Sequence, residues 1–189
     1  MAKKDNHAFY KFSIKKYGIS AKGVHWNSKY TQYKRFEVLT SFIETQIKDS
    51  SIIDAGCGFA EYYNYLFDNN LKPKSYIGID CEESMITLAS KRFIDTEFYV
   101  KNILKDKLPL ADYYICSGAM NILEKEEVFI FIEKCFESSK VAFISNFLIN
   151  DPLTKEKIKD ILLYCKNLSQ NIQIKENYLD NDISILIKK

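Results

Sequence analysis

Residues 52–60 read Ile52-Ile53-Asp54-Ala55-Gly56-Cys57-Gly58-Phe59-Ala60. An apolar run typical of a buried strand leads here into a Gly-x-Gly turn, and the residues that follow are typical of a helix. Gly56 and Gly58 have no side chains, so the turn can adopt unusual backbone angles and a ligand can lie directly against it. Asp54 stands at the carboxyl end of the strand, where open α/β sheets bind their ligands. We therefore expect an α/β fold with a ligand site at this turn.

The residue after this stretch separates two classes of ligand. The dinucleotide pattern G-x-G-x-x-G requires a third glycine at position 61, where this chain has Glu61. With Asp54 and Glu61 both beside the turn, a diphosphate would be repelled, whereas Asp54 would suit an ammonium group, directly or through water. The charges therefore favour a cationic amino-acid ligand over NAD.

A second acidic residue, Asp80, follows the next predicted strand and lies 24 residues beyond Gly56. A carboxylate at this spacing matches the ribose-binding acid of Rossmann-type folds, because it can accept hydrogen bonds from both ribose hydroxyls. The alternative is that Asp80 caps the helix that follows it.

The rest of the chain alternates short β-branched or aromatic runs with stretches of helical period, as in βαβ units. We expect a Rossmann-like three-layer sandwich whose sheet has seven strands and is mostly parallel, with the last two strands as an antiparallel edge pair. Strands are expected at residues 51–54, 75–79, 97–100, 113–116, 141–145, 172–175 and 183–187. Helices are expected at residues 60–69, 83–92, 124–138 and 151–167, the last one beginning at Asp151-Pro152.

The first quarter of the chain differs from the remainder in charge. Residues 1–50 carry ten Lys or Arg against four Asp or Glu, whereas the whole chain has 27 against 25. Residues 30–47 have the apolar spacing of an amphipathic helix. We interpret residues 1–47 as an N-terminal lid or helical extension and residues 48–189 as the ligand-binding domain. The basic residues are explained either by a solvated surface or by attraction of an anionic substrate or nucleic acid.

Composition excludes several classes of protein. The chain of 189 residues is 47% hydrophobic and 28% charged, which is ordinary for a globular domain. No apolar run reaches the roughly 18 to 20 residues that cross a bilayer, and the first residues lack a secretory signal, so we expect a cytoplasmic protein without a membrane partner. The five cysteines have no CxxC pair and there are two histidines. We therefore expect free, buried thiols and no metal site.

Three stretches of the chain together resemble the class I S-adenosylmethionine-dependent methyltransferase family. They are DAGCGFAEYYNYL at residues 54–66, YIGIDCEESMITLA at 76–89 and ADYYICSGAMNIL at 111–123. The resemblance extends over about residues 35 to 189. It implies that S-adenosylmethionine is the cofactor, that S-adenosylhomocysteine is the product, and that the chain is an enzyme.

The same resemblance assigns cofactor-binding roles to individual residues. The glycine-rich loop would hold the methionine half, the acid after the second strand the ribose, and Asn102 the adenine edge, where aspartate is more frequent in the family. The residues implied in this way are Asp54, Gly56, Cys57, Gly58, Asp80, Cys81, Met85, Asn102, Ile103, Ser117 and Gly118.

Three further residues are candidates with alternatives. Arg35 could pair with the cofactor carboxylate, for which a guanidinium is well shaped, or form a surface ion pair. His25 could be a general base and Asn121 could face the cofactor or the acceptor, but a lone histidine is usually structural, and the catalytic assignment stays open.

The methyl acceptor is expected to be a small molecule. No sizeable insertion follows the later strands, so residues 1–47 would form the substrate cover, and a compact acceptor with an anionic or aromatic part would suit that basic, aromatic segment. RNA or a protein as acceptor is the first alternative, since Tyr and Phe residues are interleaved with the basic ones. A non-catalytic cofactor-binding partner subunit is the second. The sequence leaves the oligomeric state open.

Overall fold

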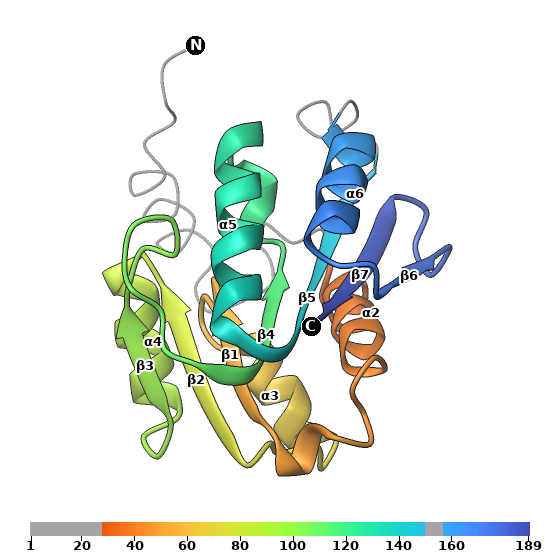
Figure 1. The fold of residues 1–189 in the computed structure, drawn as a ribbon. Coiled ribbons are helices and arrows are strands. Elements are labelled where there is room, and N and C mark those ends of the chain that lie inside the picture. Colours follow the sequence, from red (N-terminus) through yellow and green to blue (C-terminus); the bar gives the residue numbers. More distant parts are fainter. Residues whose placement is uncertain (1–27, 150–156) are drawn as a thin grey trace.

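A seven-stranded sheet with the order β3-β2-β1-β4-β5-β7-β6 forms the centre of the computed structural model (Figure 1). The structure describes residues 28–149 and 157–189. Strands β1 to β5 pair in parallel, and β7 pairs antiparallel with both β5 and β6. The strands are β1 Ser51–Ala55, β2 Ser75–Asp80, β3 Glu97–Val100, β4 Ala111–Ser117, β5 Ser139–Leu148, β6 Ile172–Glu176 and β7 Asp182–Lys188. This arrangement confirms the predicted sheet and its antiparallel edge pair.

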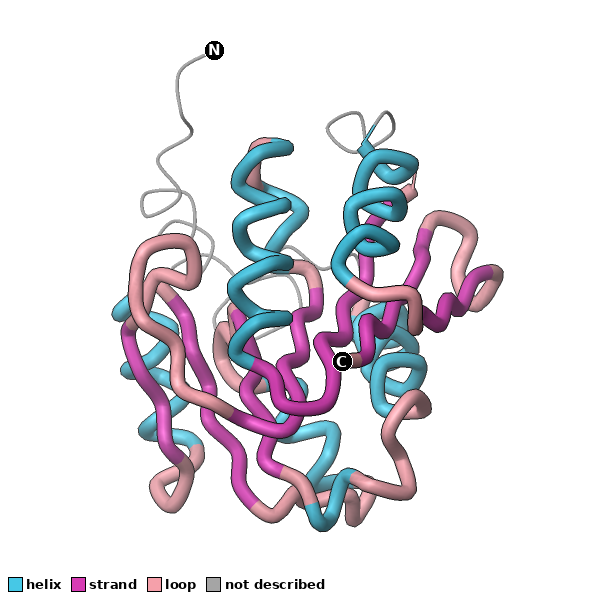
Figure 2. Tube along the Cα trace, viewed as in Figure 1, coloured by secondary structure: helices cyan, strands magenta, loops and turns pink. Residues whose placement is uncertain are grey.

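Helices cover both faces of the sheet, which gives three layers (Figures 1 and 2). Two core clusters show which helix lies on which face: one contains side chains of α5 and α6, and the other contains side chains of α2, α3 and α4. The helices are α2 Lys29–Thr40, α3 Glu61–Asp68, α4 Glu83–Arg92, α5 Lys125–Ser138 and α6 Lys157–Leu168, with short 3-10 helices at η2 Ile47–Asp49 and η3 Ala119–Ile122.

The sequence explains why these segments are helical. Helix α5 buries apolar side chains at helical spacing, among them Val128, Phe131 and Ile132. Its first turn is closed by a capping box between Glu124 and Glu127, which satisfies backbone N–H groups that have no partner inside the helix.

The predicted N-terminal helix is shorter than expected. Helix α2 begins after its N-cap Ser28, whose hydroxyl accepts the N–H of Thr31, and it ends at Thr40 rather than at residue 47. Turns and the 3-10 helix η2 follow, which still place Ile43 and Ile47 in the same core cluster as Leu39. Apolar residues at helical spacing are therefore buried here although the helix does not continue through them.

Other boundaries differ by small amounts, because pairing extends strands beyond their apolar centres. Strand β5 reaches from Ser139 to Leu148 because it pairs along its length with β4 and β7. The predicted start of the fourth helix at Asp151-Pro152 lies outside the described residues. Within the described part of the chain, no helix has the length and apolar character needed to cross a membrane.

Candidate functional site

The glycine turn after β1 has the unusual backbone angles that the sequence predicts. Gly56 and Gly58 have φ angles of 82° and 53°, in the left-handed region that favours glycine. A Cβ on Gly56 would lie 2.2 Å from the Cβ of Ala119, so the turn and the segment after β4 are in direct contact. The N–H groups of Gly56 and Cys57 donate to the carbonyl of Ile79, at 2.7 and 3.0 Å, which fixes the turn to β2.

Asp54 is a buried acid at the carboxyl end of β1. Its side chain is 3% exposed, and its Oδ2 accepts a hydrogen bond from the hydroxyl of Tyr76 at 2.5 Å. Burial raises the pKa of Asp54 to about 7, against the lowering effect of the Tyr76 hydrogen bond and with a further rise from the nearby charge of Asp80. An ammonium group placed beside Asp54 would stabilise its charged form.

Asp80 lies at the carboxyl end of β2, next to the glycine turn. One carboxylate oxygen accepts the N–H of Gly58 at 3.0 Å and the other accepts the N–H of Glu82 at 2.9 Å. Burial raises its pKa, and these backbone hydrogen bonds oppose the rise. Each oxygen can accept a further hydrogen bond, so the orientation set by the backbone is compatible with the predicted ribose role.

Glu61, which was expected to repel a diphosphate, forms an ion pair with Arg92 that compensates its charge. The same guanidinium donates to the carbonyl of Phe59 at 3.2 Å. Helix α4 thereby holds the end of the glycine turn, and the acidic charge beside the turn comes from Asp54 and Asp80.

The segment after β4 supplies further polar groups to this edge of the sheet. Gly118 has a φ angle of 82° and begins the 3-10 helix η3, which contains Asn121. Among the described residues, the Ser117 Oγ and the Asn121 Oδ1 are buried without a hydrogen-bond partner. Buried polar atoms are normally satisfied, so these two atoms are free to accept hydrogen bonds from a bound molecule. A ligand with an ammonium group, hydroxyls and an adenine amine offers such donors.

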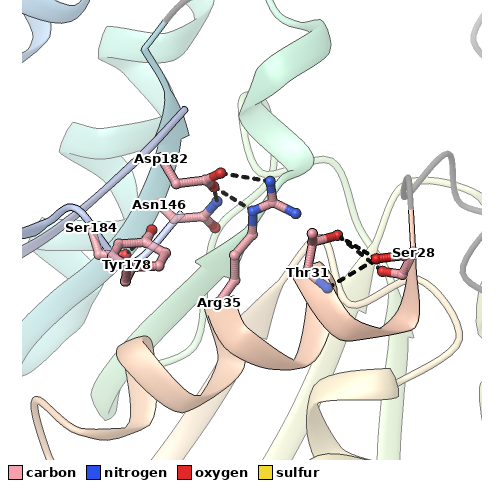
Figure 3. Close-up of polar contacts among 7 residues, drawn as sticks. All are labelled: Ser28, Thr31, Arg35, Asn146, Tyr178, Asp182 and Ser184. Carbon is pink, nitrogen blue, oxygen red and sulfur yellow. Dashed lines mark hydrogen bonds and ion pairs between the residues drawn. The ribbon is translucent and has the colours of Figure 1, made fainter. Parts of the chain in front are cut away.

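Arg35 lies on α2 and forms a buried ion pair with Asp182 of β7 (Figure 3). Its Nη2 donates to Asp182 Oδ2 at 2.7 Å, and its Nε donates to Oδ1 of the same carboxylate. The two side chains are 8% and 2% exposed, so the surface-ion-pair alternative is wrong. The role of Arg35 toward a cofactor carboxylate stays a prediction.

The remaining predicted cofactor residues lie in different surroundings. Cys57 is buried in the glycine turn, and Met85 is buried in α4. Ile103 belongs to the core cluster that contains side chains of α5. The Asn102 Oδ1 accepts the N–H of Leu104 at 2.9 Å, within its own turn.

All five cysteines are free thiols, and four are buried as expected. Cys81 is exposed, which corrects the expectation for that residue: it follows the end of β2 and precedes α4, so neither core cluster covers it. His25 lies outside the described residues. No cluster of metal ligands is present among the residues that the structure describes.

A depression of about 330 Å³ lies elsewhere on the described part of the molecule. It is bordered by Tyr30, Tyr33, Lys34, Glu37, Tyr65 and Asn69, none of which is a predicted site residue. Its lining comes from α2 and from α3 and the residue after it, away from the carboxyl ends of β1, β2 and β4.

The structure adds three residues to this edge that the sequence analysis missed. They are Tyr76, which holds Asp54, and Asp182 and Asn146, which lie near Arg35 in a buried group (Figure 3). The sequence signal that could have identified them is a polar residue within an otherwise apolar strand.

Several solved structures share this fold. The magnesium protoporphyrin IX methyltransferase of Synechocystis PCC 6803, solved with bound SAH, matches at 13% identity and a TM-score of 0.65, over 82% of this chain and 83% of that chain. A TehB-like SAM-dependent methyltransferase of Corynebacterium glutamicum ATCC 13032 matches at 13% identity and a TM-score of 0.70, over 96% of this chain and 99% of that chain. An O-methyltransferase family protein of Burkholderia thailandensis matches at 12% identity and a TM-score of 0.66, over 82% of this chain and 55% of that chain. Identities this low establish likeness of fold alone.

The sequence itself gives the family. No curated protein matches the chain at the sequence level. The sequence profile described as "Methyltransferase domain" matches residues 47–182, which include the glycine turn, Asp80 and the segment after β4. This match confirms the resemblance inferred from the three sequence stretches, and the chain belongs to the methyltransferase domain family.

Proposed function

We propose that this chain is an S-adenosylmethionine-dependent methyltransferase that acts on a small molecule. The observation that carries the proposal is that three glycines with positive φ, in the turns after β1 and β4, meet two acids, Asp54 and Asp80, at the carboxyl ends of the strands. Close backbone approach suits the methionine half of the cofactor, and the acids suit its ammonium and ribose hydroxyls.

The division of work between cofactor and protein follows from this arrangement. The bound cofactor supplies an activated methyl group, whose bond to sulfur breaks as the bond to the acceptor forms, and the acceptor loses a proton. The protein's share is positioning: Asp54, held by Tyr76, would bind the ammonium, and Asp80, held by Gly58 and Glu82, would bind the ribose. Fixing donor and acceptor in line supplies much of the acceleration in such reactions.

A small acceptor is favoured over nucleic acid by the charge of this edge. Asp54 and Asp80 lie there without a cationic partner among the described ion pairs, and carboxylates repel a phosphate backbone. The fold is compatible with such an acceptor, because one solved neighbour is named a magnesium protoporphyrin IX methyltransferase. Residues 1–47 would then serve as the cover of the domain formed by residues 48–189.

Calorimetric titration with S-adenosylmethionine, S-adenosylhomocysteine and NADH tests the proposal. We expect both adenosyl ligands to bind, NADH not to bind, and Asp80→Ala to weaken adenosyl binding at least tenfold, about 1.4 kcal/mol, through loss of the ribose hydrogen bonds. Asp112→Ala is the matched control, because the Asp112 carboxylate also accepts two hydrogen bonds, both from Ser51, but at the start of β4.

Two results would contradict the proposal. NADH binding without adenosyl binding would point to an oxidoreductase. Adenosyl binding with no methyl transfer to any member of an acceptor panel would point to the non-catalytic partner subunit.

A further inference from the structure

A row of polar side chains crosses the sheet from Ser117, itself a predicted cofactor residue, to strands β5 and β7. Ser117 of β4 pairs in register with Asn146 of β5, and Asn146 pairs with Ser184 of β7. Paired residues on neighbouring strands point to the same face of a sheet. Two residues back along β4 and β5, Ile115 and Ile144 belong to the core cluster that includes α2, so the polar row faces α2 as well.

The orientation of the Asn146 amide is set by its neighbour. Its Nδ2 lies 3.4 Å from Asp182 Oδ1, and a carboxylate oxygen requires a donor, so the amide oxygen must point the other way (Figure 3). The residue is 0% exposed, and within the described part of the chain its Oδ1 has no hydrogen-bond partner. Ser184, on the next strand, is satisfied by the hydroxyl of Tyr178 at 2.7 Å.

The Ser117 Oγ on the other side of Asn146 is also buried without a partner among the described residues. Two adjacent strands therefore present unsatisfied oxygens at the same level and on the same face. A buried amide oxygen without a donor is costly, and native proteins rarely keep one unless water or a ligand supplies the donor. Ser117 can donate or accept, whereas the Asn146 oxygen can only accept, so Asn146 decides the chemistry of the partner.

We propose that the Asn146 Oδ1, together with the Ser117 Oγ, binds an N–H or O–H group of the methyl acceptor. This inference rests on the proposed function, and it narrows the acceptor to a compact neutral or cationic molecule that carries such a donor. An acceptor that presents a carboxylate or phosphate to this subsite has no donor for the Asn146 Oδ1, and two acceptor atoms in contact repel each other. The sequence-based expectation was a compact acceptor with an anionic or aromatic part, based on the basic and aromatic N-terminal segment; this inference retains a compact acceptor and excludes an anionic group at this subsite.

Arg35 and Asp182 act as positioning residues in this arrangement. The guanidinium holds both carboxylate oxygens of Asp182, and Asp182 Oδ1 in turn holds the Asn146 Nδ2. Helix α2 thereby fixes the direction of the Asn146 oxygen from across the face of the sheet.

Ligand-observed NMR with four fragments on one ring tests the inference: benzyl alcohol, benzamide, benzylamine and benzoate, each added to protein saturated with S-adenosylhomocysteine. We expect the three donor-bearing fragments to bind and benzoate not to bind. Asn146→Ala and Ser117→Ala should each weaken the donor-bearing fragments by about fivefold, the loss of one neutral hydrogen bond. Ser145→Ala is the control, because Ser145 neighbours Asn146 in β5 and faces the opposite side of the sheet.

The outcomes separate this inference from the proposed function. Benzoate binding as well as benzyl alcohol, binding of no donor-bearing fragment, or donor-bearing fragments that bind both variants as they bind the wild type would each overturn the subsite. Failure of the wild type to bind S-adenosylhomocysteine would instead refute the proposed function. Circular dichroism shows whether each variant is folded, and Ser117→Ala, which removes fewer atoms, provides the second test if Asn146→Ala does not fold.

Discussion

Replacing Arg35 by methionine removes the cation from the buried ion pair that joins α2 to β7. Asp182, with its side chain 2% exposed, would then be a buried carboxylate without its charge partner. Removal of one member of a buried pair typically costs roughly 3–5 kcal/mol. For a chain of this size each kcal/mol corresponds to roughly 2–4 °C, so the Tm of Arg35→Met should fall by roughly 6–20 °C.

The second half of the experiment removes the charge that was left behind. In the double variant Arg35→Met/Asp182→Asn, no uncompensated charge remains, and the amide can still accept the hydrogen bond of Asn146. We expect the double variant to be more stable than Arg35→Met alone, with a coupling energy of roughly 2–3 kcal/mol between the two positions. Urea unfolding of the wild type, both single variants and the double variant, followed by circular dichroism, measures this coupling. Additive losses would refute the argument that the pair is what holds α2 on the sheet.

The same four proteins decide between the two roles of Arg35. Because Asp182 engages its Nε and Nη2, we expect the double variant to bind S-adenosylhomocysteine nearly as well as the wild type. A loss of more than about tenfold, or about 1.4 kcal/mol, in a double variant of restored stability would mean that the guanidinium contacts the cofactor carboxylate.

Three other changes probe the predicted cofactor site. Gly56→Ala should abolish S-adenosylhomocysteine binding in calorimetry, since its Cβ would lie 2.2 Å from that of Ala119 and its φ is 82°; unchanged affinity would contradict the close contact. Tyr76→Phe should weaken binding at neutral pH, because the hydroxyl of Tyr76 lowers the pKa of Asp54 and its loss favours the uncharged acid; equal affinities at neutral pH would argue against this. Because the pKa of Asp54 is raised to about 7, the Asp54 carboxyl must lose its proton before it can bind an ammonium at lower pH. The affinity for S-adenosylhomocysteine should therefore rise by up to about tenfold per pH unit toward pH 7 and then level off. The affinity of Asp54→Asn should not change with pH over this range. The free protein should show the opposite trend: the raised pKa means that stability is fully present below the ordinary value of 3.8 and is lost as pH rises through about 7, a loss that urea titrations should find absent in Asp54→Asn.

Local patterns were sufficient to predict the strands and the glycine turn. Apolar runs of strand length ended in glycine or acid at positions 56 and 80, and the parallel pairing of β1 with β2 brings those ends together. The pattern-based reading of α2 was less accurate, because apolar residues at helical spacing can also be buried by turns. Ile43 and Ile47 are in the core although the helix ends at Thr40.

Long-range pairing of charges could not be read from the sequence. Glu61 was expected to act on the ligand through its charge, but Arg92, at the end of α4, neutralises it. Arg35 was considered for a ligand or the surface, and its partner Asp182 is 147 residues away. Spacing rules describe neighbours along one helix or strand, so they give no information on which acid a distant arginine meets.

The missed polar row had a signal in the sequence all the same. Strand β5 reads SKVAFISNFL, and a strand buried on both faces should be apolar along its length, so Asn146 interrupts the pattern at a position that can reach no solvent. Strand β7 likewise carries Asp182 and Ser184 among apolar residues. Because β7 runs antiparallel to β5, its first residues meet the last residues of β5, and the interruptions fall at one level of the sheet. Polar residues that interrupt apolar strands at the carboxyl ends of a sheet cost packing energy, so they are expected mainly where a site requires them. On β5 and β7 they are the sequence signal for the proposed acceptor subsite, which the glycines of the turn after β1 do not reveal.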